Sequence, residues 1–388
     1  MMDNVRLGVI GVGGMGSGHC KRIAEGQIPN MTLTAVCDIR ESRRIWAKEN
    51  LPDTVHIYDT AEALMDSGDV DAIFIVTPHY LHSVYVIKGL KRGLHVLSEK
   101  PAGVYTKQVR EMNEEAKKHN LVFALMFNQR TNPVYIKMRE IVQSGEYGQI
   151  KRVNWIITDW YRTQAYYNSG DWRATWDGEG GGVLLNQCPH NLDLIQWICG
   201  MPKRVRAFCH EGKWHDIEVE DDVTAYLEYP NGATGVFITS TGDAPGTNRF
   251  EIDLERAKLV SENGRLMMYE MEENERTFCF SATEGFAKPD GEWKEIPTPG
   301  ENTQHNGVLK AFTDAILYGT PLIADGCEGI NGLTLSNAMH LSSWTESMIE
   351  IPFDEDKFLS ELNKRRQSSK KKTNVTETTF STEGTYGS

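Results

Sequence analysis

Short apolar segments alternate with amphipathic segments over residues 1–127 of this chain. The apolar segments show no polar–apolar alternation, as is typical of strands that are covered on both faces of a parallel sheet. They lie at residues 5–10, 33–37, 72–76, 94–98 and 121–126. The amphipathic segments between them predict helices, for example over 60–67, 80–92 and 105–119. We therefore predict an α/β domain with a doubly wound parallel sheet over residues 1–127.

The pattern changes after residue 130. Residues 134–144 and 189–199 predict helices, and the turn at 229–232 is a hairpin signal. Further strands are predicted at 150–158, 203–210, 222–229, 234–241, 249–254, 257–260 and 265–270, and further helices at 305–318 and 328–348. We predict an α+β domain over 128–355, with an antiparallel sheet and helices on one of its faces.

The composition is ordinary for a protein of two domains. The chain has 388 residues, of which 40% are hydrophobic and 24% charged, and its net charge of −13 argues against nucleic acid or an anionic membrane as a partner. No segment has the length and apolarity of a membrane span, and the chain begins directly with a strand, so we expect a cytoplasmic protein. Residues 367–388 contain almost no apolar residues and predict a disordered tail.

The cysteines give no sign of a disulfide framework or a metal site. All seven are scattered, and none forms a C-x-x-C pair, so we expect reduced thiols. Cys209, His210 and His215 are close in sequence, but no second pair of ligands accompanies them. We therefore predict no metal.

The turn after the first predicted strand has the pattern G-x-G-x-x-G, in Gly11-Val12-Gly13-Gly14-Met15-Gly16. The first glycine permits a tight turn, the second lets the backbone approach a pyrophosphate, and the third lets the next helix pack closely. The N–H groups at the start of that helix would face the phosphates. These features predict a dinucleotide site.

The second predicted strand ends on Asp38, at the spacing of a carboxylate that binds the adenosine ribose hydroxyls. Ile39 and Arg40 follow it. Asp38 favours NAD over NADP, because a carboxylate repels the 2′-phosphate. Arg40 could receive that phosphate, so NADP stays open as the less favoured cofactor.

Polar residues follow the third predicted strand, in Thr77-Pro78-His79-Tyr80-Leu81-His82. Ligands of doubly wound sheets bind at the carboxyl ends of the strands, so Thr77 and Pro78 are expected to line the cofactor cleft. His82 falls one turn into the next helix and could pack near the nicotinamide. A capped or solvated histidine is an equal alternative.

The fourth predicted strand ends in Ser98-Glu99-Lys100-Pro101. A lysine that closes a buried strand is partly desolvated, which lowers its pKa toward the range of an acid/base group. Pro101 ends the strand. The alternative is a surface lysine paired with Glu99.

Three glycines, Gly180 to Gly182, precede the predicted helix that carries His190 and Asp193. These two residues are three positions apart and share a helix face. With Asn186, four positions before His190, they are candidates for holding a hydroxyl and moving its proton. The alternative is a helix N-terminus with ordinary polar residues.

The segment 159–176 is rich in aromatic residues and arginines. Aromatic faces stack on sugar rings, and arginines hold hydroxyls or carboxylates, so Tyr161, Tyr166, Arg173 and Trp176 are candidate substrate-binding residues. An oligomer contact is an equal alternative, because the same residue types mark interfaces.

Together these motifs resemble the Gfo/Idh/MocA family, the group of glucose–fructose oxidoreductase and inositol dehydrogenase. The resemblance covers residues 4–355 and includes a further motif, Asn128-Gln129-Arg130. It implies a Rossmann domain followed by an α+β domain with an open, mainly antiparallel sheet. It also implies hydride transfer between a nicotinamide and a carbinol carbon of a sugar, polyol or related molecule. Homo-oligomers built through that sheet are implied as well, with tetramers favoured.

The resemblance places the family's catalytic lysine on Lys100 and its catalytic histidine on His190. It places a contact to substrate hydroxyls on Asp193. Members that resemble inositol dehydrogenase carry an aspartate at the position of Asn186, and an amide cannot take a hydroxyl proton. This departure argues against an inositol substrate and leaves Lys100 and His190 to share the proton transfer.

We expect an NAD-dependent dehydrogenase that oxidises a secondary hydroxyl of a sugar, glycoside or polyol, with C3 of a pyranoside as one candidate position. The alternatives are an inositol 2-dehydrogenase, an NAD-dependent glycosidase that uses transient oxidation, and a non-catalytic NAD or sugar sensor. The intact Lys100 and His190 argue against a sensor. The expected cofactor-binding residues are Gly11, Gly13, Gly14, Met15, Gly16, Asp38, Ile39, Arg40, Thr77, Pro78, His82, Glu99, Lys100 and Asn128.

Overall fold

The computed structural model describes residues 3–370, 372, 373, 375 and 376. Its first sheet has six parallel strands in the order β3-β2-β1-β4-β5-β6. The strands are β1 (Val5–Ile10), β2 (Met31–Cys37), β3 (His56–Tyr58), β4 (Ala72–Ile75), β5 (His95–Ser98) and β6 (Phe123–Leu125). The helices between them are α1 (Gly14–Ala24), α2 (Glu41–Asn50), α3 (Ala61–Asp66), α4 (His82–Lys91) and α5 (Thr106–Ala116). This is the doubly wound Rossmann order, whose direction reverses between β1 and β4, where ligands bind.

The second sheet has nine strands in the order β14-β13-β12-β11-β7-β10-β9-β8-β15. They are β7 (Ile150–Ile157), β8 (Arg204–Glu211), β9 (Glu220–Glu228), β10 (Thr234–Ser240), β11 (Asn248–Leu254), β12 (Ala257–Glu262), β13 (Arg265–Met271), β14 (Gly291–Glu295) and β15 (Ile349–Glu350). Neighbouring strands are antiparallel except β7 and β10. The predicted α+β architecture is confirmed.

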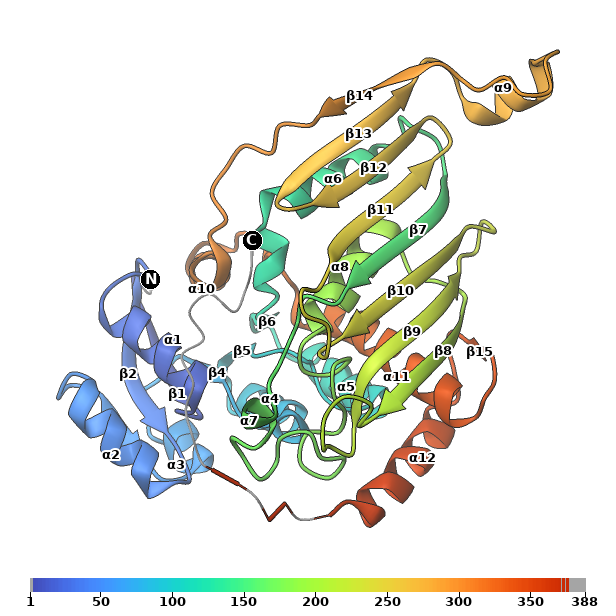
Figure 1. The fold of residues 1–388 in the computed structure, drawn as a ribbon. Coiled ribbons are helices and arrows are strands. Elements are labelled where there is room, and N and C mark those ends of the chain that lie inside the picture. Colours follow the sequence, from blue (N-terminus) through green and yellow to red (C-terminus); the bar gives the residue numbers. More distant parts are fainter. Residues whose placement is uncertain (1–2, 371, 374, 377–388) are drawn as a thin grey trace.

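Helices cover one face of this second sheet and leave the other face open (Figure 1). The covering helices are α6 (Pro133–Ser144), α8 (Pro189–Cys199) and α11 (Gly329–Trp344). Alternate strand residues face them, and at the centre the ring of Trp155 stacks on Phe250 at 4.1 Å between centroids. Both aromatic side chains are fully buried, so this stack anchors the core between the sheet and α6 and α8.

Helix α10 (Gln304–Tyr318) lies within the predicted second domain by sequence, yet it packs on the first sheet. Its Val308, Leu309 and Phe312 belong to the same hydrophobic core as β1 and β2. The chain therefore crosses back to the nucleotide-binding half after β14, as the path from β14 to α10 in Figure 1 shows. The predicted division at residue 127 therefore assigns α10 to the second domain by sequence, although α10 packs on the first sheet.

Elements that were not predicted include β3, α7 (Gln164–Tyr167), α9 (Glu275–Ser281), β14, β15 and α12 (Glu355–Ser368). Helix α12 includes the first two residues of the tail predicted to be disordered. Beyond it, Lys372 Nζ donates a hydrogen bond of 2.7 Å to the carbonyl of Tyr167. The remainder of that prediction, at residues 371, 374 and 377–388, lies outside the described residues. Among the described residues, no helix combines the length and apolarity that a membrane crossing requires.

Candidate active site

The glycine turn between β1 and α1 is packed on two sides and open on the third. A Cβ on Gly11 would lie 2.3 Å from the Val76 carbonyl oxygen, and a Cβ on Gly16 would lie 1.9 Å from that of Gly11. Gly11 also has a φ of +97°. A Cβ on Gly13 would meet nothing within 4 Å. The turn therefore keeps an open backbone face at the helix N-terminus, which is what a pyrophosphate requires.

Asp38 lies at the end of β2, beside this turn. Its carboxylate accepts hydrogen bonds from the main-chain N–H groups of Val12 (2.8 Å) and Arg40 (2.9 Å). Arg40 is directed to Asp171, with 3.8 Å between the guanidinium and the carboxylate. Ile39 is 79% exposed, as a residue that flanks a nucleotide base would be. The arrangement fits a ribose-binding carboxylate and ties the nucleotide half to the segment that contains Asp171.

Two buried polar atoms beside the turn have no hydrogen-bond partner among the described residues. They are Thr77 Oγ1, after β4, and Asn128 Oδ1, after β6. The side-chain amide of Asn128 donates to Gln304. A buried polar atom without a partner is costly, so these two atoms fit a ligand that supplies the missing hydrogen bonds.

Both ring nitrogens of His82 contact main-chain carbonyl oxygens. Its ring is buried between two carbonyl oxygens, with Nδ1 2.7 Å from that of Pro101 and Nε2 2.7 Å from that of Thr77. It therefore joins the loops that follow β4 and β5. These contacts give His82 a positioning role, and a contact of its ring with the nicotinamide stays a prediction.

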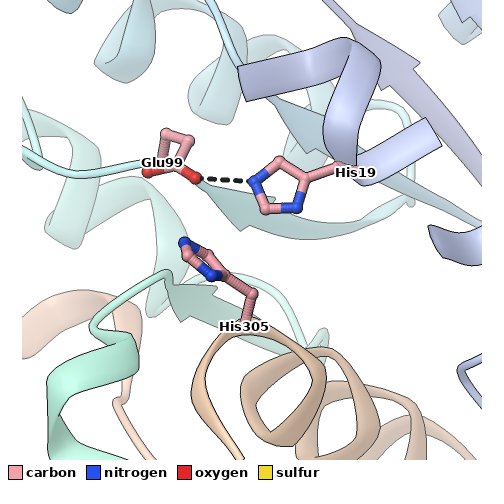
Figure 2. A group of neighbouring side chains, drawn as sticks. All are labelled: His19, Glu99 and His305. Atoms are coloured by element: carbon pink, nitrogen blue, oxygen red, sulfur yellow. Dashed lines mark hydrogen bonds and ion pairs between the residues drawn. The ribbon is translucent and has the colours of Figure 1, made fainter. Parts of the chain in front are cut away.

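His19, Glu99 and His305 form a buried group whose possible ligand atoms lie within 4.8 Å of one another (Figure 2). By donor type they could hold a divalent cation. The observed contact is instead a 2.9 Å hydrogen bond between His19 Nε2 and Glu99. A ligating histidine normally donates its other ring N–H, whereas His19 Nδ1 has no partner among the described residues. The positive charges of Arg22 and Lys100 also act on this group.

These contacts favour a hydrogen-bonded support for the Glu99–Lys100 segment over a metal centre. Burial lowers the pKa of both histidines, that of His305 to about 3. Burial would raise the pKa of Glu99, but the hydrogen bond from His19 and the charges of His19, His305 and Lys100 together outweigh it, and the pKa lies below its ordinary value. The group thus presents a carboxylate held by neutral imidazoles.

Lys100 leaves the end of β5 and reaches the second half of the protein. Its Nζ donates a 2.8 Å hydrogen bond to the main-chain carbonyl of Asn186. Burial lowers the pKa of this amine, while the charges of Glu99 and Glu179 raise it and those of Arg173 and Arg162 lower it. The balance is a lowered pKa, as a lysine that takes up and releases a proton requires.

His190 begins α8, directly after Pro189 at the first helical position. Its ring is buried and lies edge-on to Phe127, at 6.1 Å between centroids. Burial lowers the pKa of His190 well below its ordinary value, and the charge of Lys100 lowers it further. The two predicted catalytic groups therefore act on one another electrostatically across the junction of the two sheets.

Polar side chains from the loop before α8 gather beside Lys100. The Tyr166 hydroxyl is 3.4 Å from Asn186 Oδ1, and it accepts hydrogen bonds from Arg173 (2.7 Å) and Gln187 (3.3 Å). Gln187 Oε1 is buried without a partner among the described residues. Glu179 accepts a hydrogen bond from the Asn186 amide. This polar wall could hold several hydroxyls of a substrate.

Glu179 and Gln187 are not among the residues predicted from the sequence. Glu179 precedes the three glycines, and an acid beside a glycine-rich turn was the only signal for it. Gln187 had none, since a glutamine between Asn186 and a buried cysteine is unremarkable in any loop.

Two predicted substrate contacts are placed elsewhere. Asp193 is buried and both of its oxygens accept hydrogen bonds from Arg130, each at 2.7 Å. Trp176 is buried against His340 and Trp344, at 5.7 and 5.5 Å between ring centroids. Asp193 is thus engaged by an ion pair and Trp176 by aromatic packing, and a contact of either side chain with substrate stays a prediction. Tyr161 is 49% exposed.

Comparison with known proteins decides the family. Residues 5–127 match the model described as the oxidoreductase family with an NAD-binding Rossmann fold, and residues 135–260 match the GFO/IDH/MocA C-terminal domain. The chain belongs to the Gfo/Idh/MocA family. It is an NAD-dependent oxidoreductase.

Other Gfo/Idh/MocA proteins resemble it over most of their length. Trans-1,2-dihydrobenzene-1,2-diol dehydrogenase of Bos taurus is 29% identical, over 69% of this chain and 72% of its own. Levoglucosan dehydrogenase of Pseudarthrobacter phenanthrenivorans is 24% identical, over 90% and 99%. Myo-inositol 2-dehydrogenase of Thermotoga maritima is 27% identical, over 67% and 76%.

Solved structures share the fold. The WlbA dehydrogenase of Bordetella pertussis, in complex with NADH and UDP-GlcNAcA, superposes with a TM-score of 0.75 at 22% identity, over 90% of this chain and 100% of that one. Levoglucosan dehydrogenase in complex with NADH and levoglucosan gives a TM-score of 0.72 at 20% identity, with the same coverage.

Proposed function

We propose that this Gfo/Idh/MocA protein oxidises a secondary hydroxyl of a sugar, glycoside or polyol with NAD, and that Lys100 and His190 handle the hydroxyl proton. The observation that carries the proposal is the hydrogen bond from Lys100 to the Asn186 carbonyl, four residues before His190. It brings an amine from the nucleotide half to the loop that leads into α8, and the charge of this amine lowers the pKa of His190. Relatives named for inositol and levoglucosan support the substrate class.

The proton transfer follows from the hydrogen-bonding capacity of a neutral amine. Neutral Lys100 retains two N–H donors and one lone pair. One N–H is used by the Asn186 carbonyl, which leaves the lone pair free to accept the hydroxyl proton. His190, kept neutral by burial, can donate a hydrogen bond to the same oxygen as it becomes a carbonyl. NAD, when bound, accepts the hydride of the carbinol C–H.

The cofactor would lie along the glycine turn, with Asp38 on the adenosine ribose and Thr77 and Asn128 on the nicotinamide side. The two buried oxygen atoms without partners support this path. Tyr166, Arg173, Asn186 and Gln187 would hold neighbouring substrate hydroxyls. Asp193 and Trp176 are left out of the proposed substrate site because Asp193 is paired with Arg130 and Trp176 packs against Trp344.

The test is an NADH-absorbance screen with inositols, free sugars, glycosides and sugar acids. We expect NADH formation with at least one class, lowered by roughly 10²- to 10⁴-fold in Lys100→Ala. The rate should be retained in Lys107→Ala, because Lys107 forms an exposed ion pair with Asp356. Absence of NADH with every class, in a preparation shown to bind NAD, would refute the proposal. Release of free sugar from a glycoside without net NADH would favour the glycosidase alternative.

A homo-oligomer built through the open face of the second sheet belongs to the same proposal. Strand residues on that face include Phe208 and Tyr226, which are 51% and 37% exposed. Apolar side chains on an open sheet face are typical of a subunit contact. Light scattering tests this, and a monomer at micromolar concentration would contradict it.

A further inference from the structure

Glu179 is a buried carboxylate inside the candidate active site, and no role has been assigned to it so far. It lies in the loop before α8, and the residue is only 1% exposed. One oxygen accepts a 2.5 Å hydrogen bond from the main-chain N–H of Ala174, and the other accepts the side-chain amide of Asn186. Arg173 lies 3.7 Å away. A carboxylate so enclosed is costly unless its charge is used or compensated.

The partner of Glu179 is the residue that also holds Lys100. Asn186 gives its side-chain amide to Glu179 and its main-chain carbonyl to the Lys100 ammonium or amine. Glu179 is therefore joined to the proposed proton acceptor through one residue. The main-chain carbonyl of Glu179 is also 3.2 Å from Nδ1 of His79, which follows β4. Glu179 therefore connects the loop before α8 to the nucleotide-binding half.

Glu179 thus lies one side chain away from Lys100, behind the Asn186 amide. Burial raises the pKa of the Glu179 carboxyl, while the charge of Arg173 and the hydrogen bonds from Ala174 and Asn186 lower it. An acidic side chain therefore acts on Lys100, although the residue bonded directly to the amine carries an amide.

We propose that Glu179 is a positioning residue that holds Asn186 in place under Lys100 and supplies the negative charge that this site needs. The inference rests on the proposed function, since it assigns a role relative to the proton acceptor. Glu179 does not touch the reacting atoms, and it acts through Asn186 and through its charge.

The charged groups around Lys100 determine in which direction its pKa changes when the charge of Glu179 is removed. Glu99 and Glu179 raise its pKa, whereas Arg173 and Arg162 lower it. The buried imidazoles of His79, His82, His190 and His305 also interact with it. Removing the charge of Glu179 leaves Glu99 as the acid that supports the ammonium form. The pKa of Lys100 then falls, and the amine becomes neutral at lower pH.

The experiment compares the pH dependence of kcat/KM for sugar oxidation in the wild type and in Glu179→Gln. Oxidation requires the neutral amine, so the rate rises with pH through the pKa of Lys100. We expect this rise to move to lower pH by about one unit in Glu179→Gln, the scale of losing one nearby opposite charge. We also expect kcat to fall by roughly 10-fold, since a misplaced group near the reacting atoms has such an effect.

Glu218→Gln is the matched control. Glu218 anchors the same loop by accepting the main-chain N–H of Trp176 at 2.7 Å, whereas the charges that shift the pKa of Lys100 most are those of Glu99, Glu179, Arg173 and Arg162. Loosening the loop should lower the rate in both variants, whereas only Glu179→Gln should shift the pH dependence. An unshifted rise in Glu179→Gln, or an equal shift in Glu218→Gln, overturns the inference.

Two further measurements keep the test decisive. Glu179→Asp retains the charge, so it should restore the pH dependence of the wild type; a shift in it would contradict the inference. The rate at which an amine-specific reagent labels Lys100 at increasing pH, followed by mass spectrometry, reports the same pKa without turnover. A wild-type protein with no turnover refutes the proposed function, while labelling of Lys100 still tests Glu179 separately.

Discussion

Replacing Asp193 by asparagine separates a structural role from substrate binding at this position. The sequence predicts a contact to substrate hydroxyls, but the structure pairs the carboxylate with Arg130 through two hydrogen bonds of 2.7 Å. Each of the two side chains is 1% exposed. The guanidinium also faces the Trp197 ring, at 5.2 Å from its centroid. The pair joins the loop after β6 to α8, which carries His190.

The magnitude follows from the burial of this pair. Removing one partner of a buried ion pair costs about 3–5 kcal/mol, because the other charge is left without compensation. The side chain introduced by Asp193→Asn would retain one acceptor oxygen, and Arg130 keeps Glu328 as a partner at 2.6 Å. We therefore expect Asp193→Asn to lower the free energy of unfolding by about 3 kcal/mol, the lower end of this range. For a domain of roughly 150–250 residues this lowers Tm by about 6–12 °C.

Thermal unfolding followed by circular dichroism measures the loss, and steady-state kinetics with the sugar identified by the screen measures KM. We expect the Tm to fall and KM to change by less than about threefold, since less than 1 kcal/mol of binding is involved. Glu328→Gln is the control: Glu328 binds the same guanidinium but is 45% exposed, so its loss should cost about 1 kcal/mol or less. An unchanged Tm in Asp193→Asn together with a KM raised tenfold or more would refute the reasoning.

The remaining predictions concern the cofactor and the proton. Lys100→Ala should lower kcat by roughly 10²- to 10⁴-fold, the usual contribution of a general base, while calorimetry finds NAD affinity largely retained. Asp38→Ala should lower the ratio of kcat/KM with NAD to that with NADP, since the carboxylate that repels the 2′-phosphate is gone; an unchanged ratio would remove Asp38 from cofactor selection. Gly16→Ala should abolish NAD binding or folding, because its Cβ would lie 1.9 Å from a carbonyl oxygen, whereas Gly18→Ala, with its nearest neighbour 4.0 Å away, should be tolerated.

The elements that the sequence predicted are those with a strong local pattern. The strands that became β1, β4 and β5 are short and mostly buried segments rich in apolar residues, and the 189–199 helix is apolar at helical spacing. The elements it missed have few buried residues to reveal them. Helix α12 buries only Phe358 and Leu362, and no residue of α9 is buried.

The candidate site shows the same division. Lys100 and the glycine turn could be predicted, because each follows a buried parallel strand and the carboxyl ends of such strands meet at one edge. The side chains that contact these residues could not be predicted from the sequence. Glu179 and Asp193 are both acidic residues near His190 in sequence, yet the loop turns Glu179 toward Asn186 and α8 turns Asp193 toward Arg130.

The amino-acid order by itself determined the two sheets, the nucleotide-binding turn and the two groups proposed to move the proton. These depend on local periodicity and on backbone geometry that only certain residues permit. The tertiary structure alone decided which polar side chains line the site and which are enclosed, and it returned α10 to the first sheet. The physical reason is that a buried charge needs an opposite charge or a hydrogen-bond partner nearby. The fold supplies that partner from a distant part of the chain, so separation along the sequence does not predict it.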